Sequence, residues 1–356
     1  MNNKIKRQFK IGSKTIGKEH ECFVIAEAGV NHNGDLNTAI KLVDVAADAD
    51  ADAVKFQTFQ ADEVATKHAE MTDYQKINTG RIKSQRLMLR DLELPERFYE
   101  PIISHCLKRK IIFLSTPHGG IKSINFLESL GIEAYKIGSA DLTNFLLLDK
   151  IVSLRKPMIL STGMADLNEV LLTMNHLGKK GASNIAFLHC TNHYPCPLEE
   201  VNLLAMQTMI ESLNVPVGYS DHTIGFQTAI MAVTLGASIY ECHFTLDRSL
   251  PGPDHLASAE PEELKNKIGL IRKIKKILGK NVKKPTKYES KKMIPLIRKS
   301  LVVSKDLTKG HLLKAIDLAS KRPGDGLSPS LYEKLIGKRT IHNFNKDDQI
   351  FLKDLK

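Results

Sequence analysis

Eight short runs of β-branched and aliphatic residues recur along the first two thirds of the chain, and a helical pattern follows each of them. The runs begin at Cys22, Asp52, Ile111, Glu133, Pro157, Asn184, Val215 and Ser238. They are nearly continuous in apolar residues, as strands of a parallel sheet covered by helices must be. Eight β-α units in about 250 residues predict an α/β fold, the closed (β/α)8 or TIM barrel.

Shorter patterns flank the predicted barrel. Before it, QFKIGSKTIGKEHE alternates polar and apolar residues, which predicts a hairpin that closes the barrel floor. The last barrel helix is predicted to end near Gly279, and a lysine-rich connector follows. Short strands and turns then fit a compact domain of about 60 residues. We place the barrel domain at 1–280, the linker at 281–297 and the C-terminal domain at 298–356.

The formal net charge of +11 comes largely from lysines, which crowd into residues 265–299 without interleaved aromatic residues. This pattern favours a solvated helix face and linker over nucleic-acid binding, and the positive field helps to attract a polyanionic substrate. No stretch of about 18 apolar residues occurs, so we predict no membrane partner and expect a cytoplasmic protein. The five cysteines form no C-x-x-C pair, so neither a disulfide framework nor a structural zinc site is indicated.

The segment 217–255 brings chemistry-bearing residues to the ends of the last two predicted strands. His222 follows one strand and His243 ends the next, with Asp221 and Glu241 beside them. Parallel strands open their carboxyl ends on one side, where the active sites of such folds lie, so the two imidazoles should be close together. Two such imidazoles suit a borderline divalent metal with open coordination positions.

Other predicted strand ends carry lysines, hydroxyls and carboxylates. Lys55 and Lys136 supply two fixed positive charges, and the hydroxyls are those of Thr116, Ser139, Ser161 and Ser220. This set suits a phosphate joined to a carboxylate, while a metal at the histidines would polarise a carbonyl oxygen under attack by a carbon nucleophile. The candidates for proton transfer, or for orienting hydroxyls and water, are Glu27, Asp247 and Glu241.

Two further features bear on the site. The second β-α connection, 59–94, is unusually long and contains YQKINTG at 74–80. A long loop on the catalytic side is typical of a lid or substrate wall, with disorder as the alternative. No G-x-S-x-G, Walker or G-x-G-x-x-G motif occurs in a fitting context, which disfavours serine hydrolysis, nucleotide hydrolysis and nicotinamide chemistry.

An ordered series of motifs resembles a known family. The series is IAEAGVNHNGD, VKFQTF, YQKINTG, FLSTP, YKIGSADLTN, ILSTGM, LHCTNHYPCP, VGYSDHT, ECHFTLD, PGPDH and KRPGDG. It resembles the bacterial sialic acid synthases, which include N-acetylneuraminate, legionaminic acid and pseudaminic acid synthases. The resemblance spans nearly the whole chain and includes a C-terminal antifreeze-like (SAF, β-clip) domain.

The resemblance implies a metal-dependent condensation of phosphoenolpyruvate with an N-acetylated hexosamine, giving a nine-carbon 2-keto acid and phosphate. We expect N-acetylmannosamine as the sugar, which would make the chain an N-acetylneuraminate synthase. The alternative is N,N'-diacetyllegionaminate synthase, acting on 2,4-diacetamido-2,4,6-trideoxymannopyranose. The pseudaminic branch fits less well, because its strand-end motifs differ more.

The resemblance also implies roles for individual residues. The metal, Mn²⁺ first with Mg²⁺ or Co²⁺ as the other candidates, would bind His222 and His243. The implied phosphoenolpyruvate contacts are Lys55, Thr116, Lys136, Ser139, Ser161, Asn192 and Ser220. The implied sugar and water contacts are Glu27, Gln57, Tyr194 and Asp247. The family's active form is a domain-swapped homodimer, in which Arg322 would reach the partner's sugar pocket.

The chain departs from the family pattern at a few positions. Asp141 stands where glutamate is usual, close to the sugar or metal-bound water, and Ala140 where glycine is common. Cys242 replaces a basic residue and His118 a phenylalanine. A hypothesis from another class is an inactive barrel with a polyanion- or ice-binding C-terminal module. The presence of both lysines and both histidines counts against it.

Overall fold

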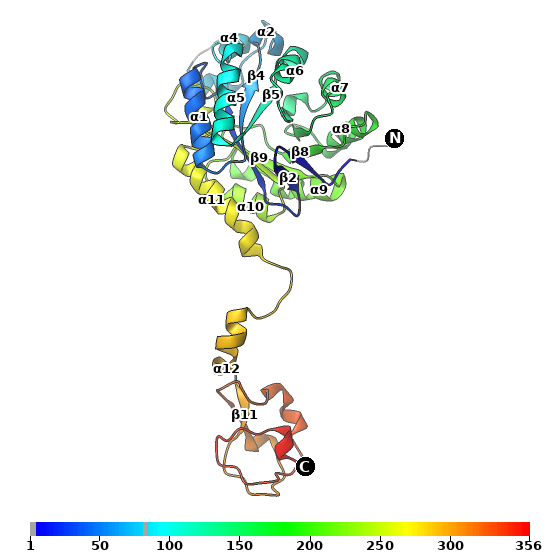
Figure 1. Ribbon diagram of the computed structural model, residues 1–356, viewed down its shortest axis with the longest axis vertical. Helices are drawn as coiled ribbons and strands as arrows, with labels where there is room; N and C mark the ends of the chain where they lie inside the picture. The colour runs from blue at the N-terminus through cyan, green and yellow to red at the C-terminus, as the bar shows by residue number, and fades with distance from the viewer. Residues whose placement is uncertain (1–4, 81–83) are drawn as a thin grey trace. The chain divides into compact units, whose positions relative to one another are not determined.

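The computed structural model describes residues 5–80 and 84–356 and divides into two compact units at Gly279 (Figure 1). The first unit contains the barrel and the second the C-terminal domain, and each is described by itself. Within the described residues no helix combines the length and apolarity of a membrane span.

Eight parallel strands close into a barrel in the first unit, in the order β10-β3-β4-β5-β6-β7-β8-β9. The strands are β3 (Phe23–Gly29), β4 (Ala53–Thr58), β5 (Ile112–Pro117), β6 (Tyr135–Ile137), β7 (Met158–Ser161), β8 (Ile185–His189), β9 (Val217–Asp221) and β10 (Ile239–His243). Each coincides with one of the eight runs found in the sequence, so the predicted (β/α)8 architecture is confirmed. The barrel closes between the first and last of these strands, where His243 of β10 aligns with Glu27 of β3.

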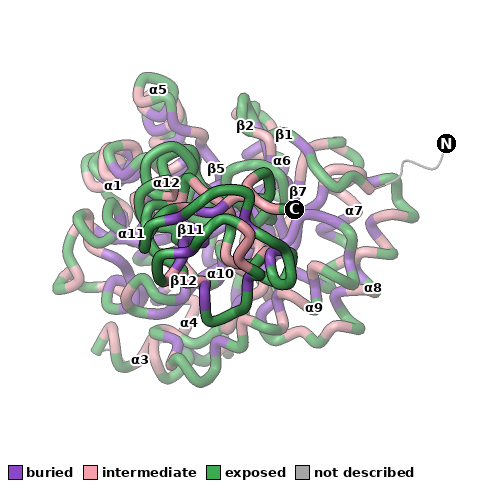
Figure 2. The backbone as a smooth tube through the Cα atoms, turned by 90° about the horizontal axis from the view of Figure 1, so that it is seen from below, coloured by how far each residue is buried: buried purple, intermediate pink, exposed green. Residues whose placement is uncertain are grey.

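A helix follows each strand and covers the outside of the barrel (Figure 1). These helices are α1 (Leu36–Asp48), α5 (Tyr99–Arg109), α6 (Gly120–Ser129), α7 (Phe145–Ser153), α8 (Leu167–Lys179), α9 (Leu203–Leu213), α10 (Gln227–Thr234) and α11 (Pro261–Leu278). Two of these helices have side-chain caps at their N-termini: Asp35 accepts from Thr38 N, and Asp166 forms a capping box with Glu169. Figure 2 shows buried and exposed stretches alternating along α8 and α9, as amphipathic helices require.

The predicted hairpin closes the barrel floor. It consists of β1 (Gln8–Ile11) and β2 (Lys14–Gly17), paired antiparallel. Its apolar face contributes Phe9, Ile11 and Ile16 to one cluster with inward-facing strand residues such as Phe23 and Leu114. A separate, larger core lies between the strands and the outer helices. These side chains fill the N-terminal end of the barrel, so the active site is expected at the opposite end.

The long connection between β4 and α5 folds into short helices, which favours the substrate-wall interpretation. They are α2 (Ala61–Val64), α3 (Asp73–Thr79) and α4 (Gln85–Arg90), while residues 81–83 lie outside the described part. Met88 of α4 and two residues outside the helices, Met71 and Leu92, pack with Val30 and Phe59 in a small core of their own. This packing fixes α4 beside the C-terminal ends of β3 and β4.

The second unit has a compact core of a few apolar side chains. Strands β11 (Ser300–Val303) and β12 (Leu318–Lys321) pair antiparallel, and Leu301, Val303 and Leu335 pack among the buried residues. A π-helical turn (Glu289–Met293) and α12 (Ile294–Ile297) precede β11.

Candidate active site

A buried network of two lysines and two glutamates occupies the mouth of the barrel. Lys55 Nζ lies 2.8 Å from Glu27 Oε2 and 3.7 Å from Glu241 Oε2. Lys136 Nζ lies 3.3 Å from Glu241 Oε1. The four residues are 1–4% exposed and come from β3, β4, β6 and β10. Buried charges persist when they are paired, so this network is balanced within itself.

The charges shift one another's pKa values. Although burial opposes ionisation, Lys136 and Lys55 lower the pKa of Glu241 to about 2. Burial raises the pKa of Glu27, and Lys55 opposes this shift. Burial lowers the pKa of Lys136, with Glu241 opposing it. Glu241 is therefore a permanent carboxylate between the two ammonium groups, whereas Glu27 is the more easily protonated acid.

Three of the predicted hydroxyls complete this network. Lys55 Nζ donates to Thr116 Oγ1 at 3.2 Å, and Lys136 Nζ donates to Ser161 Oγ at 2.7 Å. Ser220 Oγ donates to Glu241 Oε1 at 2.9 Å. Side chains from strands across the barrel thus fix both ammonium groups at the C-terminal face.

His222 and His243 lie side by side, with 5.6 Å between their ring centroids. Burial and the field of His243 lower the pKa of His222 to about 4, while burial and Lys55 lower the pKa of His243 to about 3. Both rings are therefore neutral at pH 7. His222 Nδ1 donates to Thr191 O at 2.6 Å, which leaves its Nε2 as a lone-pair donor.

These histidines fit a divalent metal. Neutral imidazoles are the form that binds metal, and the Nδ1 atom of His243 is buried without a hydrogen bond among the described residues. Among the residues that the structure describes, no three His, Cys, Asp or Glu side chains form a cluster that could hold a metal ion. A metal held by this pair would keep open positions for water and substrate.

Aromatic rings connect the histidines to helix α3. The Tyr194 ring lies 4.1 Å from that of His222 and 5.1 Å from that of Tyr74, centroid to centroid. On the same helix, Asn78 Nδ2 donates to Pro253 O at 2.6 Å. Helix α3 therefore forms a wall of the mouth, as the position of YQKINTG predicted.

Asp254 is a site residue that sequence reasoning missed. Its carboxylate is 8% exposed, and its Oδ2 lies 4.0 Å from His243 Nδ1. Burial and the nearby Glu27 raise the pKa of Asp254 to about 7. Asp254 follows β10 by eleven residues, so no strand pattern predicted its position, although it lies in the PGPDH motif.

Asp247, the residue chosen from the sequence, lies elsewhere. It is exposed, and its Oδ1 accepts from Ser249 N at 2.7 Å and from Ser249 Oγ at 2.6 Å. Its carboxylate closes a local turn just after β10, because short polar side chains readily bond to backbone N–H groups two residues ahead. The structure thus brings Asp254, and not Asp247, next to His243.

The remaining predicted contacts lie around the mouth or in the second unit. Gln57 Nε2 donates to Glu27 Oε1 at 3.2 Å. Ser139 Oγ accepts from Gly163 N at 3.0 Å, and Asn192 lies against the same glycine. Burial raises the pKa of Asp141, whose Oδ1 accepts from Asn144 Nδ2 at 2.9 Å. Arg322 belongs to the second unit, where its Nε donates to Ile297 O at 3.1 Å.

Two other departures from the family pattern, His118 and Cys242, have different surroundings. The His118 ring packs against Gly138, and burial together with Lys55 and Lys136 lowers its pKa to about 3. His118 therefore adds a neutral imidazole to the lysine side of the mouth. Cys242 alternates with the inward-facing Glu241 and packs in the core between strands and helices. The change at Cys242 thus affects packing behind the site.

Fold and site together define an enzyme class. A (β/α)8 barrel that gathers paired ammonium groups and two neutral imidazoles at its C-terminal face has the arrangement of an enzyme active site. The profile of the NeuB family matches residues 42–283, and that of the SAF domain matches residues 298–356. The chain belongs to the NeuB family.

Several relatives that match nearly the whole chain are named as synthases of legionaminic or N-acetylneuraminic acids. The N,N'-diacetyllegionaminic acid synthase of Campylobacter jejuni is 46% identical over 93% of this chain and 99% of its own. The Legionella pneumophila enzyme of the same name is 43% identical over 94% of each chain. Human N-acetylneuraminate-9-phosphate synthase is 30% identical over 94% of this chain and 93% of its own.

A solved structure agrees with these relatives. The N-acetylneuraminic acid synthetase of Leptospira borgpetersenii is 33% identical, with a TM-score of 0.71, and covers 82% of this chain and 96% of its own. The chain is therefore a barrel synthase with a C-terminal SAF domain, as the sequence motifs indicated.

Proposed function

We propose that this protein is an N,N'-diacetyllegionaminate synthase, which condenses phosphoenolpyruvate with 2,4-diacetamido-2,4,6-trideoxymannopyranose. The order of the two candidate sugars is thereby reversed from that expected from the sequence. The higher identity to the two legionaminic acid synthases, 46% and 43% against 30% for the human enzyme, supports the reversal. The lysine–glutamate network beside two neutral imidazoles is the arrangement that best supports this class of reaction.

Phosphoenolpyruvate is assigned to the lysine side of the mouth. Its phosphate and carboxylate would take over part of the charge pairing that Glu27 and Glu241 now give Lys55 and Lys136. Glu241 stays ionised and keeps both ammonium groups in place, so it is a positioning residue. The further contacts to this substrate are Thr116, Ser139, Ser161, Asn192 and Ser220.

The sugar is assigned to the opposite side, next to the histidines. Gln57 and Glu27 are already hydrogen-bonded there, and Asp254 lies beside His243. The Tyr194 ring offers a flat apolar surface between His222 and Tyr74. These groups suit the hydroxyls and the acetamido group of an open-chain amino sugar.

The reaction makes one carbon–carbon bond and releases phosphate. C3 of phosphoenolpyruvate adds to the aldehyde carbon, and the aldehyde oxygen takes a proton. Water then adds to the cationic C2, losing a proton, and the bond from C2 to the phosphate oxygen breaks. Glu27, whose pKa burial raises, is the group assigned to accept the proton of the attacking water.

A divalent metal, Mn²⁺ by preference, would be held by His222 and His243. When bound, it would supply Lewis-acid polarisation of the aldehyde oxygen. The proximity of the two imidazole rings and the buried His243 Nδ1 atom, which has no hydrogen bond among the described residues, support this assignment.

We also propose that the active form is a domain-swapped homodimer. The second unit has a small core of its own, and Arg322 lies on its surface. A guanidinium is well suited to a sugar acetamido oxygen in a partner's mouth, because it presents several donors in a fixed plane.

Phosphate release measured with phosphoenolpyruvate and Mn²⁺ tests the proposed function. The diacetamido-trideoxy sugar should give a kcat/KM at least tenfold above that of N-acetylmannosamine, and a chelator should abolish both rates. No release with either sugar would refute the synthase assignment. A preference for N-acetylmannosamine would restore the original order of the two substrates.

A further inference from the structure

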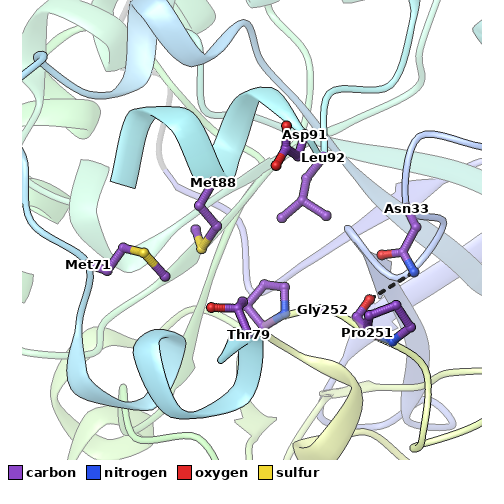
Figure 3. Close-up of a pocket in the computed structure, with 9 residues that line it drawn as sticks. Asn33, Met71, Thr79, Met88, Asp91, Leu92, Pro251 and Gly252 are labelled. Atoms are coloured by element: carbon purple, nitrogen blue, oxygen red, sulfur yellow. Dashed lines mark hydrogen bonds between the residues drawn. The ribbon is translucent and has the colours of Figure 1, made fainter. Parts of the chain in front are cut away.

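A pocket of about 200 Å³ is lined in part by the loop after β10, which also carries Asp254 (Figure 3). Three segments meet around it: the turn after β3, the helical connection between β4 and α5, and the loop after β10. Its lining residues are Asn33, Met71, Thr79, Met88, Asp91, Leu92, Pro251, Gly252 and Pro253. The volume equals that of about seven water molecules in the liquid, enough for a substituent of a sugar chain.

The lining is mostly apolar and partly adaptable. Met71, Met88 and Leu92 lie on one side of the space, and Pro251 and Gly252 of the loop after β10 lie on another (Figure 3). Methionine side chains are flexible and polarisable, so they adjust to the shape of an apolar group. Asn33 Nδ2 donates to Pro251 O at 3.0 Å and holds that loop against the turn after β3.

The pocket and the mouth share bordering segments. Pro253 precedes Asp254, the acid beside His243, and accepts a hydrogen bond from Asn78. Thr79 follows Asn78 at the end of α3, and Tyr74 of that helix stacks on Tyr194. One helix and one loop therefore border both the reaction site and the pocket.

We propose that this pocket is the subsite for the far end of the sugar, the C4 acetamido group and the C6 methyl group. The proposal rests on the proposed function, since only a sugar seated between Asp254 and Tyr194 would direct its far end there. A deoxygenated C6 suits the methionine and proline walls. N-acetylmannosamine would place hydroxyls against the same walls, and one apolar group gained or lost in such a pocket changes discrimination by about 10- to 200-fold.

Met88→Gln tests the subsite, because it keeps the length of the side chain but makes it polar. The ratio of kcat/KM for the diacetamido-trideoxy sugar over that for N-acetylmannosamine should fall about tenfold, with an unchanged KM for phosphoenolpyruvate. Met71→Gln, on another segment of the lining, should act in the same direction. Met231→Gln, at an exposed position on α10, is the matched control and should leave the ratio unchanged.

The outcomes separate this proposal from the proposed function. An equal loss of kcat/KM for both sugars in correctly folded Met88→Gln and Met71→Gln would overturn the subsite while the wild-type preference still stood. A wild-type enzyme that ignores the diacetamido-trideoxy sugar would overturn the proposed function itself. Thermal denaturation of each variant identifies any that fail to fold.

Discussion

At the scale of single residues, the two aspartates after β10 show what local pattern leaves undecided. Asp247 and Asp254 are seven positions apart in one loop, and both carry the same carboxylate. The fold exposes the first and buries the second next to His243. Burial beside the histidines, rather than residue type, is what makes Asp254 the candidate.

Asp254→Asn should lower kcat/KM for the sugar by about 10- to 100-fold, because a hydrogen bond to a charged group contributes about 1.5–3 kcal/mol. The KM for phosphoenolpyruvate should change much less. The matched control, Asp247→Asn, should have a kcat/KM for the sugar within about twofold of the wild-type value. Steady-state phosphate release measures both, and a larger loss in Asp247→Asn would mean that the assignment is wrong.

At the scale of elements, the barrel separates stability from chemistry. The hairpin β1–β2 fills the N-terminal end, and the charged network occupies the C-terminal end. Ile16 is fully buried in the hairpin, at 0% exposure. A substitution there should therefore act on the free energy of unfolding rather than on substrate binding.

Ile16→Ala should lower the free energy of unfolding by about 2–5 kcal/mol, through lost apolar contact and the cavity left behind. The KM values for both substrates should remain those of the wild type at temperatures where the variant is folded. Ile277→Ala, at a position 79% exposed on α11, should cost less than about 0.5 kcal/mol. Denaturant unfolding measures the difference, and equal effects would show that the hairpin does not plug the barrel.

At the scale of the whole molecule, the proposed homodimer assigns the second unit a role in catalysis. If Arg322 acts in the partner's mouth, Arg322→Ala and Lys136→Ala inactivate different parts of one shared site. A mixed dimer then contains one intact site, formed by Lys136 of one subunit and Arg322 of the other. In a dimer with C2 symmetry the two shared sites are equivalent, so the two variants must complement each other if the site is shared.

Co-expression of the Arg322→Ala and Lys136→Ala chains should restore about a quarter of the wild-type activity, because half of the dimers are mixed and each has one working site. Each variant expressed alone should be nearly inactive. Sedimentation of the purified chain should give a dimer. An isolated mixed dimer without activity, or a fully active monomer, would contradict the swapped arrangement.

Much of the fold was predictable because its signals are local. Each strand is a run of apolar residues, and Asp35 and Asp166 cap helices through bonds within three residues. The sequence also predicted which strand-end residues lie together, namely Lys55, Lys136, His222 and His243. Parallel strands bring their carboxyl ends to one face whatever the conformation of the loops. The sequence alone thus determined the barrel, its hairpin floor and the face on which the chemistry lies.

The tertiary structure decided how the loops complete that face. It selected Asp254 over Asp247, turned Cys242 outward into the core, and set Tyr74 of α3 against Tyr194. It also formed the pocket between Met88 and Pro253. The physical reason is that a strand's side-chain direction follows from its repeat of two, whereas a loop's direction depends on contacts with segments far away in the sequence.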